Sequence, residues 1–158
     1  MATVVFTDGA CLGNPGPGGW AWAVSDEHFA SGSAEATTNQ RMELCAVIEA
    51  VASLSGPLEI VSDSTYVVKC FQDRWWASWR RRSWRNSKGE PVANQDLWVD
   101  LIAAVVDERP GEIHFRWVKG HSGDPMNEFV DRLANDAARA QSDRAILPGA
   151  SFARQGES

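Results

Sequence analysis

The chain has 158 residues, of which 44% are hydrophobic and 23% charged, values ordinary for a globular protein with a single core. Its composition excludes wholesale disorder and a collagen-like repeat, and the three cysteines show no close pairing of the kind found in disulfide-stapled miniproteins. No apolar run approaches the roughly 18 residues needed to span a bilayer, and the N-terminus lacks the layout of a signal peptide. The sequence therefore predicts a soluble, cytoplasmic, monomeric protein without a membrane partner.

The net charge of −6 conceals a strongly basic segment. Residues 74–88 hold six of the 15 arginines and lysines and no acid, so the remaining nine bases face 21 acids and sum to −12. The same residues hold four of the eight tryptophans, interleaved with arginines as RWWASWRRRSWR. Cationic side chains attract phosphates and indole rings stack on bases. This basic tryptophan segment, residues 74–88, predicts a nucleic-acid-binding surface.

The first part of the chain predicts an antiparallel meander followed by a helix. Residues 4–7, 20–24 and 29–35 are predicted strands, separated by the glycine- and proline-rich GNPGPGG and by the polar SDEH turn. A helix is expected to begin at Asn39, run through QRMELCAVIEAVASL and stop at Gly56-Pro57.

The second part alternates strands and helices. Residues 58–62 form a short apolar run typical of a strand buried on both faces, and Asp63 or Ser64 can cap the helix that follows. Further on, the pattern predicts a helix over 94–108, a strand over 113–118 and a helix over 127–140. This order predicts an α/β fold with a five-stranded mixed sheet, an antiparallel meander plus parallel strands, flanked by helices. Residues 1–140 would form the domain, and residues 141–158 a flexible C-terminal tail.

Four carboxylates fall at the ends or beginnings of these predicted elements. Asp8 ends the first strand, Asp63 ends strand 58–62, Glu43 lies in the first turns of its helix and Asp131 lies early in the last helix. Functional groups gather beyond the carboxyl ends of central parallel strands, so Asp8 and Asp63 would stand side by side if their strands are neighbours. Each acid alone also has an ordinary role as a turn residue, a helix cap or solvated surface.

Convergence of the four carboxylates would require a cation. Like charges held a few Å apart in a partly buried site cannot all stay ionised unless cations neutralise them. Ligation by oxygen alone favours Mg²⁺ or Mn²⁺ over zinc. Two such ions, about 4 Å apart, are suited to phosphodiester hydrolysis, because one activates water and the other stabilises the leaving oxygen.

Six sequence motifs, taken together, resemble those of ribonuclease H type 1. They are FTDGACLGNPGPGGWAWAV, TTNQRMELCAVIEA, IVSDSTYVV, WASWRRRSW, NQDLW and WVKGHSGDPMNEFVDRLA, in the order and with the spacing of that family, over about residues 3–140. The resemblance implies a ribonuclease H-like fold. It also implies a nuclease that hydrolyses the RNA strand of an RNA/DNA hybrid, leaving 5'-phosphate and 3'-hydroxyl ends with little sequence specificity. Two Mg²⁺ ions would bind with the substrate, and Mn²⁺ could substitute.

The resemblance also implies roles for individual residues. The catalytic, metal-binding carboxylates of the family fall on Asp8, Glu43, Asp63 and Asp131. The family's loop histidine, which assists proton transfer or product departure, falls on His121.

Substrate contacts carry over by position as well. Asn14, Asn39 and Gln40 match residues that contact the minor groove and RNA 2'-hydroxyls, a task suited to short amides that both donate and accept. Thr38 and Asn94 match a pocket for a DNA-strand phosphate, and Ala36 stands where many relatives have arginine. The basic protrusion that embraces the DNA strand in bacterial relatives matches Trp75, Trp79, Arg80, Arg81, Arg82 and Trp84.

Three other functions are compatible with parts of this pattern. An integrase, transposase or resolvase could share the architecture, because a fold alone does not fix the reaction. A catalytically silent module could bind hybrids without cutting them, although such a module would be expected to have lost a carboxylate. A generic soluble domain would leave the basic tryptophan segment without a purpose.

Overall fold

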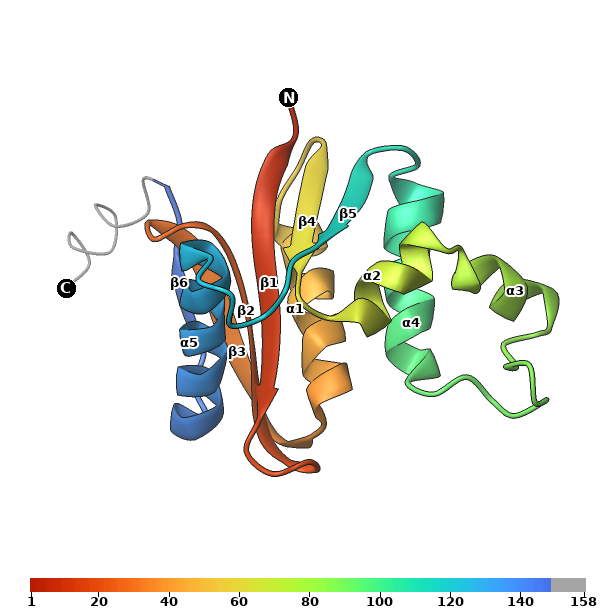
Figure 1. Ribbon diagram of the computed structural model, residues 1–158, viewed down its shortest axis with the longest axis horizontal. Helices are drawn as coiled ribbons and strands as arrows, with labels where there is room; N and C mark the ends of the chain where they lie inside the picture. The colour runs from red at the N-terminus through yellow and green to blue at the C-terminus, as the bar shows by residue number, and fades with distance from the viewer. Residues whose placement is uncertain (149–158) are drawn as a thin grey trace.

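The structure is a computed structural model in which residues 1–148 are described. Its elements in chain order are β1 (Thr3–Cys11), β2 (Gly16–Ser25), β3 (His28–Thr37), α1 (Asn39–Ser53), β4 (Leu58–Ser62), α2 (Thr65–Gln72), α3 (Trp75–Arg81), α4 (Gln95–Ile102), the π-helix η1 (Ala103–Glu108), β5 (Ile113–Trp117), α5 (Pro125–Ala140) and β6 (Arg144–Ile146). The strands form one six-stranded sheet in the order β5-β4-β1-β2-β3-β6 (Figure 1). β1 pairs antiparallel with β2 and parallel with β4, so the predicted mixed sheet is confirmed.

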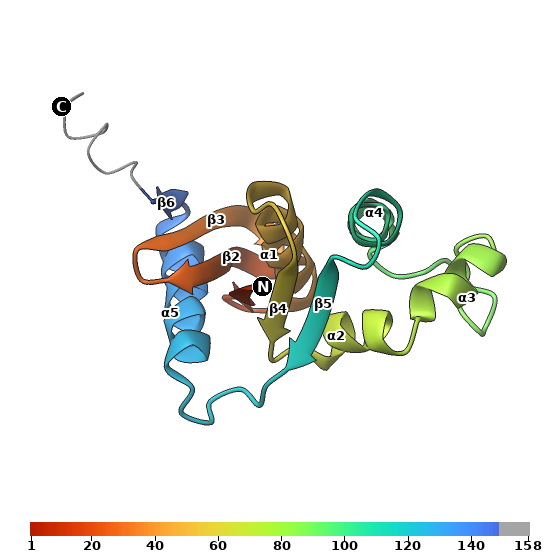
Figure 2. The same cartoon turned by 90° about the horizontal axis from the view of Figure 1, so that it is seen from above.

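Helices cover both faces of the sheet. α1 packs on one face, mainly against β1 and β2, and α5 packs against β1, β2 and β3 on the other. α2, α3 and α4 lie at the β5 end of the sheet, and α3 forms the end of the molecule farthest from α5 (Figures 1 and 2). The larger apolar core lies under α1 and α4 and contains the fully buried Trp22 and Trp98, while a smaller core lies under α5.

The helix starts follow from their capping residues. Thr38 accepts the N–H of Arg41 and begins α1, and Ser64 accepts the N–H of Val67 and begins α2. α5 begins at Pro125, two residues before the predicted start, because the carboxylate of Asp124 accepts two N–H groups and proline at the first helical position needs no donor. Within residues 1–148, no helix combines the length and hydrophobicity needed to cross a membrane.

The largest differences between the structure and the sequence prediction lie in three elements. β1 continues to Cys11, so Asp8 lies inside the strand rather than at its end. The sheet has six strands rather than five, because residues 144–146 pair antiparallel with β3 in a stretch for which no element was predicted. The basic tryptophan segment begins with the helix α3, which was not predicted either. The remaining part of the predicted tail, residues 149–158, lies outside the described residues.

One arginine closes the C-terminal end of α1. Arg109 follows η1, and its guanidinium donates to the carbonyls of Val51, Leu54 and Gly56. Val51 lies in the last turn of α1, where C=O groups have no partner within the helix, and Leu54 and Gly56 follow that turn. Arg109 is 17% exposed and also forms an ion pair with Glu112.

Replacing this arginine should destabilise the fold measurably. Arg109→Ala is expected to lower the free energy of unfolding by about 2–3 kcal/mol, because charge-assisted hydrogen bonds to half-buried carbonyls are lost. Arg116→Ala is the matched control and should cost less than about 1 kcal/mol, since among the described residues Arg116 makes only an exposed ion pair, with Glu59. Urea unfolding of both variants measures the difference, and equal losses would contradict the capping role.

Candidate active site

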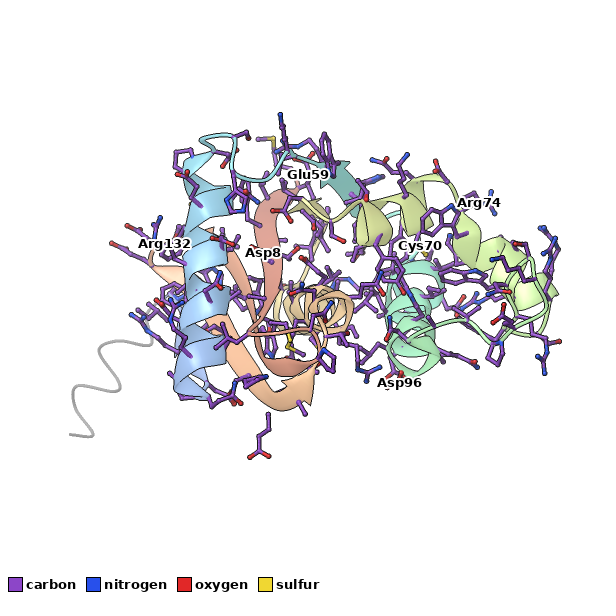
Figure 3. All side chains as sticks on the ribbon, turned by 60° about the horizontal axis from the view of Figure 1, so that its bottom comes forward. Asp8, Glu59, Cys70, Arg74, Asp96 and Arg132 are labelled. Atoms are coloured by element: carbon purple, nitrogen blue, oxygen red, sulfur yellow. The ribbon has the colours of Figure 1, made fainter. Side chains whose placement is uncertain are left out.

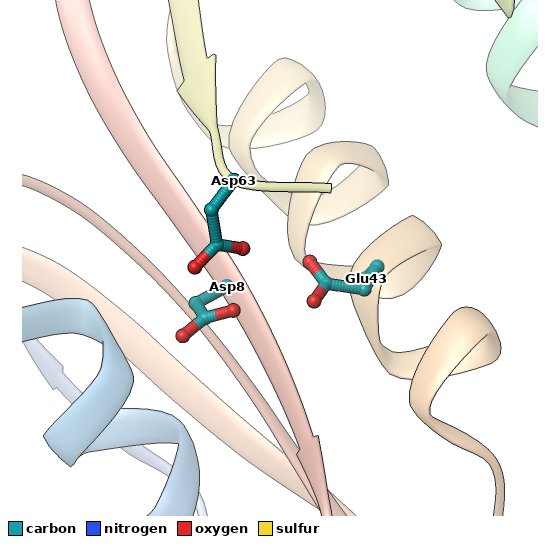
Figure 4. A group of neighbouring side chains, drawn as sticks. All are labelled: Asp8, Glu43 and Asp63. Carbon is teal, nitrogen blue, oxygen red and sulfur yellow. The ribbon is translucent and has the colours of Figure 1, made fainter. Parts of the chain in front are cut away.

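Three of the four predicted carboxylates meet beside the centre of the sheet. Asp8, Glu43 and Asp63 each offer an oxygen within 4.8 Å of the others. Their side chains come from β1, from α1 and from the residue after β4, and they point toward one another (Figure 4). Asp8 is only 3% exposed, and the other two residues are half-buried.

Strand register accounts for the meeting of the two aspartates. Phe6 of β1 pairs with Val61 of β4 in parallel register. Asp8 and Asp63 each follow their member of this pair by two residues, so they lie at the same level on neighbouring strands and on the same face. The expectation that these strands are neighbours is thereby confirmed.

Close packing of α1 on β1 brings the glutamate to the same place. A Cβ on Gly9 would lie 2.3 Å from the backbone nitrogen of Glu43 and 2.5 Å from the carbonyl carbon of Met42. Only glycine allows this approach, because real Cβ contacts of that length do not occur. The Asp8-Gly9 pair therefore combines a carboxylate with the space that Glu43 needs.

Burial sets the protonation of the cluster. The pKa of Asp8 is raised from its usual 3.8 to about 8, first by burial and then by the charge of Asp63, while the N–H of Gly9, 2.9 Å from Oδ1, opposes the shift. Burial also raises the pKa of Glu43 well above its usual value, followed by the charge of Asp8. The pKa of Asp63 is raised by burial and lowered in part by the amide of Asn127. Oε2 of Glu43 is buried and accepts no hydrogen bond.

Asp131 and His121 lie at the edge of this cluster. Asp131 is half-buried in α5, and its charge raises the pKa of both Asp8 and Asp63. Asn135 fixes Asp131 by donating from Nδ2 to its carbonyl and, at 3.3 Å, to Oδ1. His121 lies in the loop between β5 and α5 with a φ of 56°, close enough that its positive charge lowers the pKa of Asp63.

The sequence analysis missed one residue of this site, Asn127. It is 2% exposed in the first turn of α5, and its Nδ2 lies 3.5 Å from Oδ2 of Asp63. The signal that could have found it is the spacing, because Asn127 precedes Asp131 by four residues and therefore shares its helix face.

The loop that carries His121 also needs a glycine. A Cβ on Gly120 would lie 2.7 Å from Oδ2 of Asp63. Gly120→Ala should therefore displace this carboxylate or the loop, and a misplacement of about 1 Å can lower kcat on the order of 10²-fold. Single-turnover kinetics measures the effect, with affinity for substrate expected to stay within about twofold because the loss of positioning affects only the reacting centre. An unchanged kcat would show that Asp63 tolerates the shift.

The amides and the hydroxyl predicted to contact substrate gather at the N-terminus of α1. Oδ1 of Asn14 accepts the backbone N–H of Asn39 at 3.1 Å, which ties the β1–β2 turn to the helix. Nδ2 of Asn94 donates to Oε1 of Gln40 at 3.4 Å, and Thr38 is the N-cap itself. The structure thus brings Asn14, Thr38, Asn39, Gln40 and Asn94 together on one surface.

An ion pair that the sequence did not reveal holds this surface. Arg41 donates to both oxygens of Asp96 at 2.9 and 2.7 Å and to Oδ1 of Asn94 at 3.4 Å. Asp96 lies in the first turn of α4, at the end of the molecule that carries α2–α4 (Figure 3). The hydrogen bonds from Arg41 lower the pKa of Asp96 to about 2. The pair fixes Asn94, whose φ of 59° needs support from its surroundings.

The basic tryptophan segment lies apart from the carboxylates, on α3 and the turn after it. Trp79 packs edge-on against Trp98 of α4, with ring centroids 5.3 Å apart, and also contacts Trp75 and Trp84. Half-buried in one aromatic cluster are Trp75, Trp79 and Trp84. Arg81 and Arg82 are exposed on the outside of the segment, whereas Arg80 forms an ion pair with Asp107 at 2.7 Å.

Comparisons with known proteins agree with this arrangement. The family model for RNase H matches residues 1–139. The chain is 46% identical to the ribonuclease H of Thermus thermophilus over 92% of this chain and 89% of that protein, and 49% identical to the ribonuclease H of Xanthomonas oryzae pv. oryzae over 88% and 93%. A crystal structure of a type 1 RNase H with the type 2 active-site motif is similar at a TM-score of 0.73 and 31% identity, over 90% of this chain and 75% of that one. A foamy viral protease-reverse transcriptase in complex with an RNA/DNA hybrid is similar at a TM-score of 0.72 and 25% identity, over 88% of this chain and 20% of that one. With its buried carboxylate cluster and a family match over nearly all of its length, the chain belongs to the ribonuclease H family.

Proposed function

We propose that the protein is an endonuclease that hydrolyses the RNA strand of RNA/DNA hybrids, leaving 5'-phosphate and 3'-hydroxyl ends with little sequence specificity. The convergence of Asp8, Glu43 and Asp63 within 4.8 Å carries the proposal. Burial and mutual repulsion oppose the ionisation of these carboxylates unless a cation is bound, so their convergence favours a metal-dependent reaction over simple binding of nucleic acid. Similarity to a hybrid-bound foamy viral enzyme supports the choice of substrate.

The donor set fits a divalent cation bound by oxygen. Among residues 1–148, the cluster contains carboxylates and no thiol or imidazole pair, and Oε2 of Glu43 is buried without any donor. We assign Asp8, Glu43, Asp63 and Asp131 as the residues that hold two Mg²⁺ ions in the presence of substrate, with Mn²⁺ as a substitute. Bound cations supply activation of water and neutralisation of the charge that develops on the leaving oxygen.

The protein's own side chains would position the carboxylates and transfer protons. Asn127 holds Asp63 through its amide, and Gly9 and Gly120 let α1 and the β5–α5 loop close on the carboxylates. His121 is the group that can deliver or accept a proton at the edge of the cluster, because its imidazole lies on an exposed loop close enough to act on the charge of Asp63.

Removing this histidine should slow the reaction without abolishing it. His121→Ala is expected to lower kcat on the order of 10²-fold and to change the pH–rate profile, since a proton-transfer group is lost while the carboxylates remain. His114→Ala is the matched control, because His114 is exposed on β5 away from the cluster, and it should keep full activity. An unchanged pH profile in His121→Ala would contradict proton transfer by this residue.

Substrate selection is proposed to rest on shape and backbone contacts. Asn14, Asn39 and Gln40 would contact RNA 2'-hydroxyls, and Thr38 and Asn94 a phosphate of the DNA strand. The basic tryptophan segment would embrace the DNA strand, with Arg81 and Arg82 against phosphates and Trp75, Trp79 and Trp84 as the aromatic platform. We propose that the protein acts as a monomer in the cytoplasm.

A panel of substrates tests the reaction class. Labelled hybrid, single-stranded RNA, duplex RNA and duplex DNA are incubated with the protein in Mg²⁺, Mn²⁺ or EDTA. We expect cleavage of the hybrid alone, only with metal. Cleavage of duplex DNA would instead indicate an integrase-like nuclease, and binding of the hybrid without any cleavage would indicate a silent binding module.

A further inference from the structure

The three consecutive arginines of the basic tryptophan segment are not equivalent. Arg80 donates from Nη1 and Nη2 to the two carboxylate oxygens of Asp107 at 3.0 and 2.7 Å. Its guanidinium also lies over the ring of Trp76, 5.6 Å from the centroid. Within residues 1–148, Arg81 and Arg82 make no ion pair and are exposed. Of these three arginines, therefore, Arg80 alone is held in an ion pair by another of the described residues.

The acid that holds Arg80 belongs to a different part of the fold. Asp107 lies near the end of η1, which continues directly from α4. In a π-helix the hydrogen bonds run from residue i to i+5, so each turn contains more residues than in an α-helix and the side chains rotate relative to those of α4. Asp107 reaches Arg80 from there, while Asp96, at the other end of α4, faces Arg41 of α1.

The helix α3 is thus fixed to the body at two points. Trp79 packs on Trp98 of α4, and Arg80, the next residue, is bound to Asp107 of η1. α3 has seven residues, and Arg74, the residue before it, has a left-handed backbone and provides no side-chain cap. A helix this short is not stable alone, so its orientation depends on such tertiary contacts.

We infer that Arg80 is a positioning residue, which fixes the basic tryptophan segment against η1 through Asp107, and that it is not itself a contact to nucleic acid. This inference rests on the proposed function, because the position matters only if the segment binds the hybrid. As a consequence, Arg81 and Arg82 neutralise phosphates of the bound hybrid, whereas Arg80 fixes the position of the segment.

Salt dependence separates positioning from contact. Each phosphate neutralised by a cationic side chain releases counterions and adds about 1 to the slope of log affinity against log salt. A positioning residue changes affinity at every salt concentration but leaves the slope as it is. The two roles also predict opposite effects of the acid. Removing Asp107 weakens binding if it positions the segment, and strengthens binding if it merely competes with phosphate for Arg80.

The experiment measures binding of a fluorescent RNA/DNA hybrid by anisotropy in EDTA, where hydrolysis is absent, between about 50 and 200 mM KCl. Arg80→Gln and Asp107→Asn are each expected to weaken binding about fivefold, the factor that corresponds to about 1 kcal/mol for a well-oriented exposed pair. Their slopes should equal that of the wild type. Arg82→Gln should lower the slope by about 1. Thermal unfolding checks that each variant is folded.

Two further variants complete the design. Glu108→Gln removes the same charge as Asp107→Asn from the neighbouring exposed residue and should not weaken binding. The charge swap Arg80→Asp with Asp107→Arg should restore affinity, because it rebuilds the ion pair in reverse.

The outcomes are distinguishable. A slope reduced by about 1 in Arg80→Gln, tighter binding by Asp107→Asn, or no rescue by the charge swap would overturn the inference while the wild type still binds. Absence of hybrid binding by the wild type would overturn the proposed function and this inference with it.

Discussion

Asp8→Asn is expected to lower hybrid cleavage on the order of 10³-fold or more and to leave the fold intact. The substitution removes the most buried charge of the carboxylate cluster, which is 3% exposed, and groups that act as a unit lose nearly all activity when one is removed. The amide has nearly the same size, so packing around β1 and α1 is preserved. Steady-state cleavage and circular dichroism measure the two effects.

The control for this variant is Asp26→Asn. Asp26 is exposed in the turn between β2 and β3, so the substitution makes the same chemical change far from the carboxylates and should leave activity unchanged. Asp63→Asn should repeat the loss seen in Asp8→Asn. Near-wild-type turnover in either carboxylate variant would remove that residue from the proposed site.

The metal-free protein is expected to lose stability as pH rises from about 4 to about 8. The pKa of Asp8 is raised from 3.8 to about 8 in the folded state, so the folded protein holds this proton longer than the unfolded chain does. Stability from such a group is fully present below its unfolded pKa and is lost as pH rises through the folded pKa. The cost at pH 8 is on the order of a few kcal/mol.

Comparison with Asp8→Asn isolates this contribution. The variant cannot titrate at this position, so in EDTA it should be more stable than the wild type at pH 8 by about 2 kcal/mol and similar to it at pH 4. Mg²⁺ should raise the Tm of the wild type more at pH 8 than at pH 5, since it binds the ionised carboxylates, and should have little effect on the variant. Parallel pH profiles for the two proteins would contradict the buried-carboxylate account.

Much of the site could be predicted because its carboxylates lie in or beside predicted elements, within motifs that resemble those of ribonuclease H type 1. Asp63 comes directly after a short apolar strand, and Glu43 lies in a helix of good formers with a clear N-cap at Thr38. The parallel neighbours β1 and β4 then place Asp8 and Asp63 at one level. Sequence order and the handedness of crossovers restrict such sheets to few arrangements.

Other features depend on tertiary contacts, which local sequence patterns do not indicate. The end of β1 was misplaced because Asp8-Gly9 has the composition of a turn, whereas its pairing with β2 continues to Cys11. β6 has three residues and exists only by pairing with β3. Asn127 acquires its role from Asp63, 64 positions away in the sequence. The ion pairs of Arg41 and Arg80 join residues more than 25 positions apart, so no local pattern indicates them.

The central claim is that this carboxylate cluster cuts one strand of a hybrid. The most direct test labels the RNA and DNA strands of one hybrid with different fluorophores and follows both in Mg²⁺, with wild-type protein, Asp63→Asn and an EDTA control. The account predicts loss of the RNA strand only, by wild-type protein and only with metal, with products whose 3' ends a polymerase can extend. An intact RNA strand under these conditions, or equal cleavage of both strands, would contradict it.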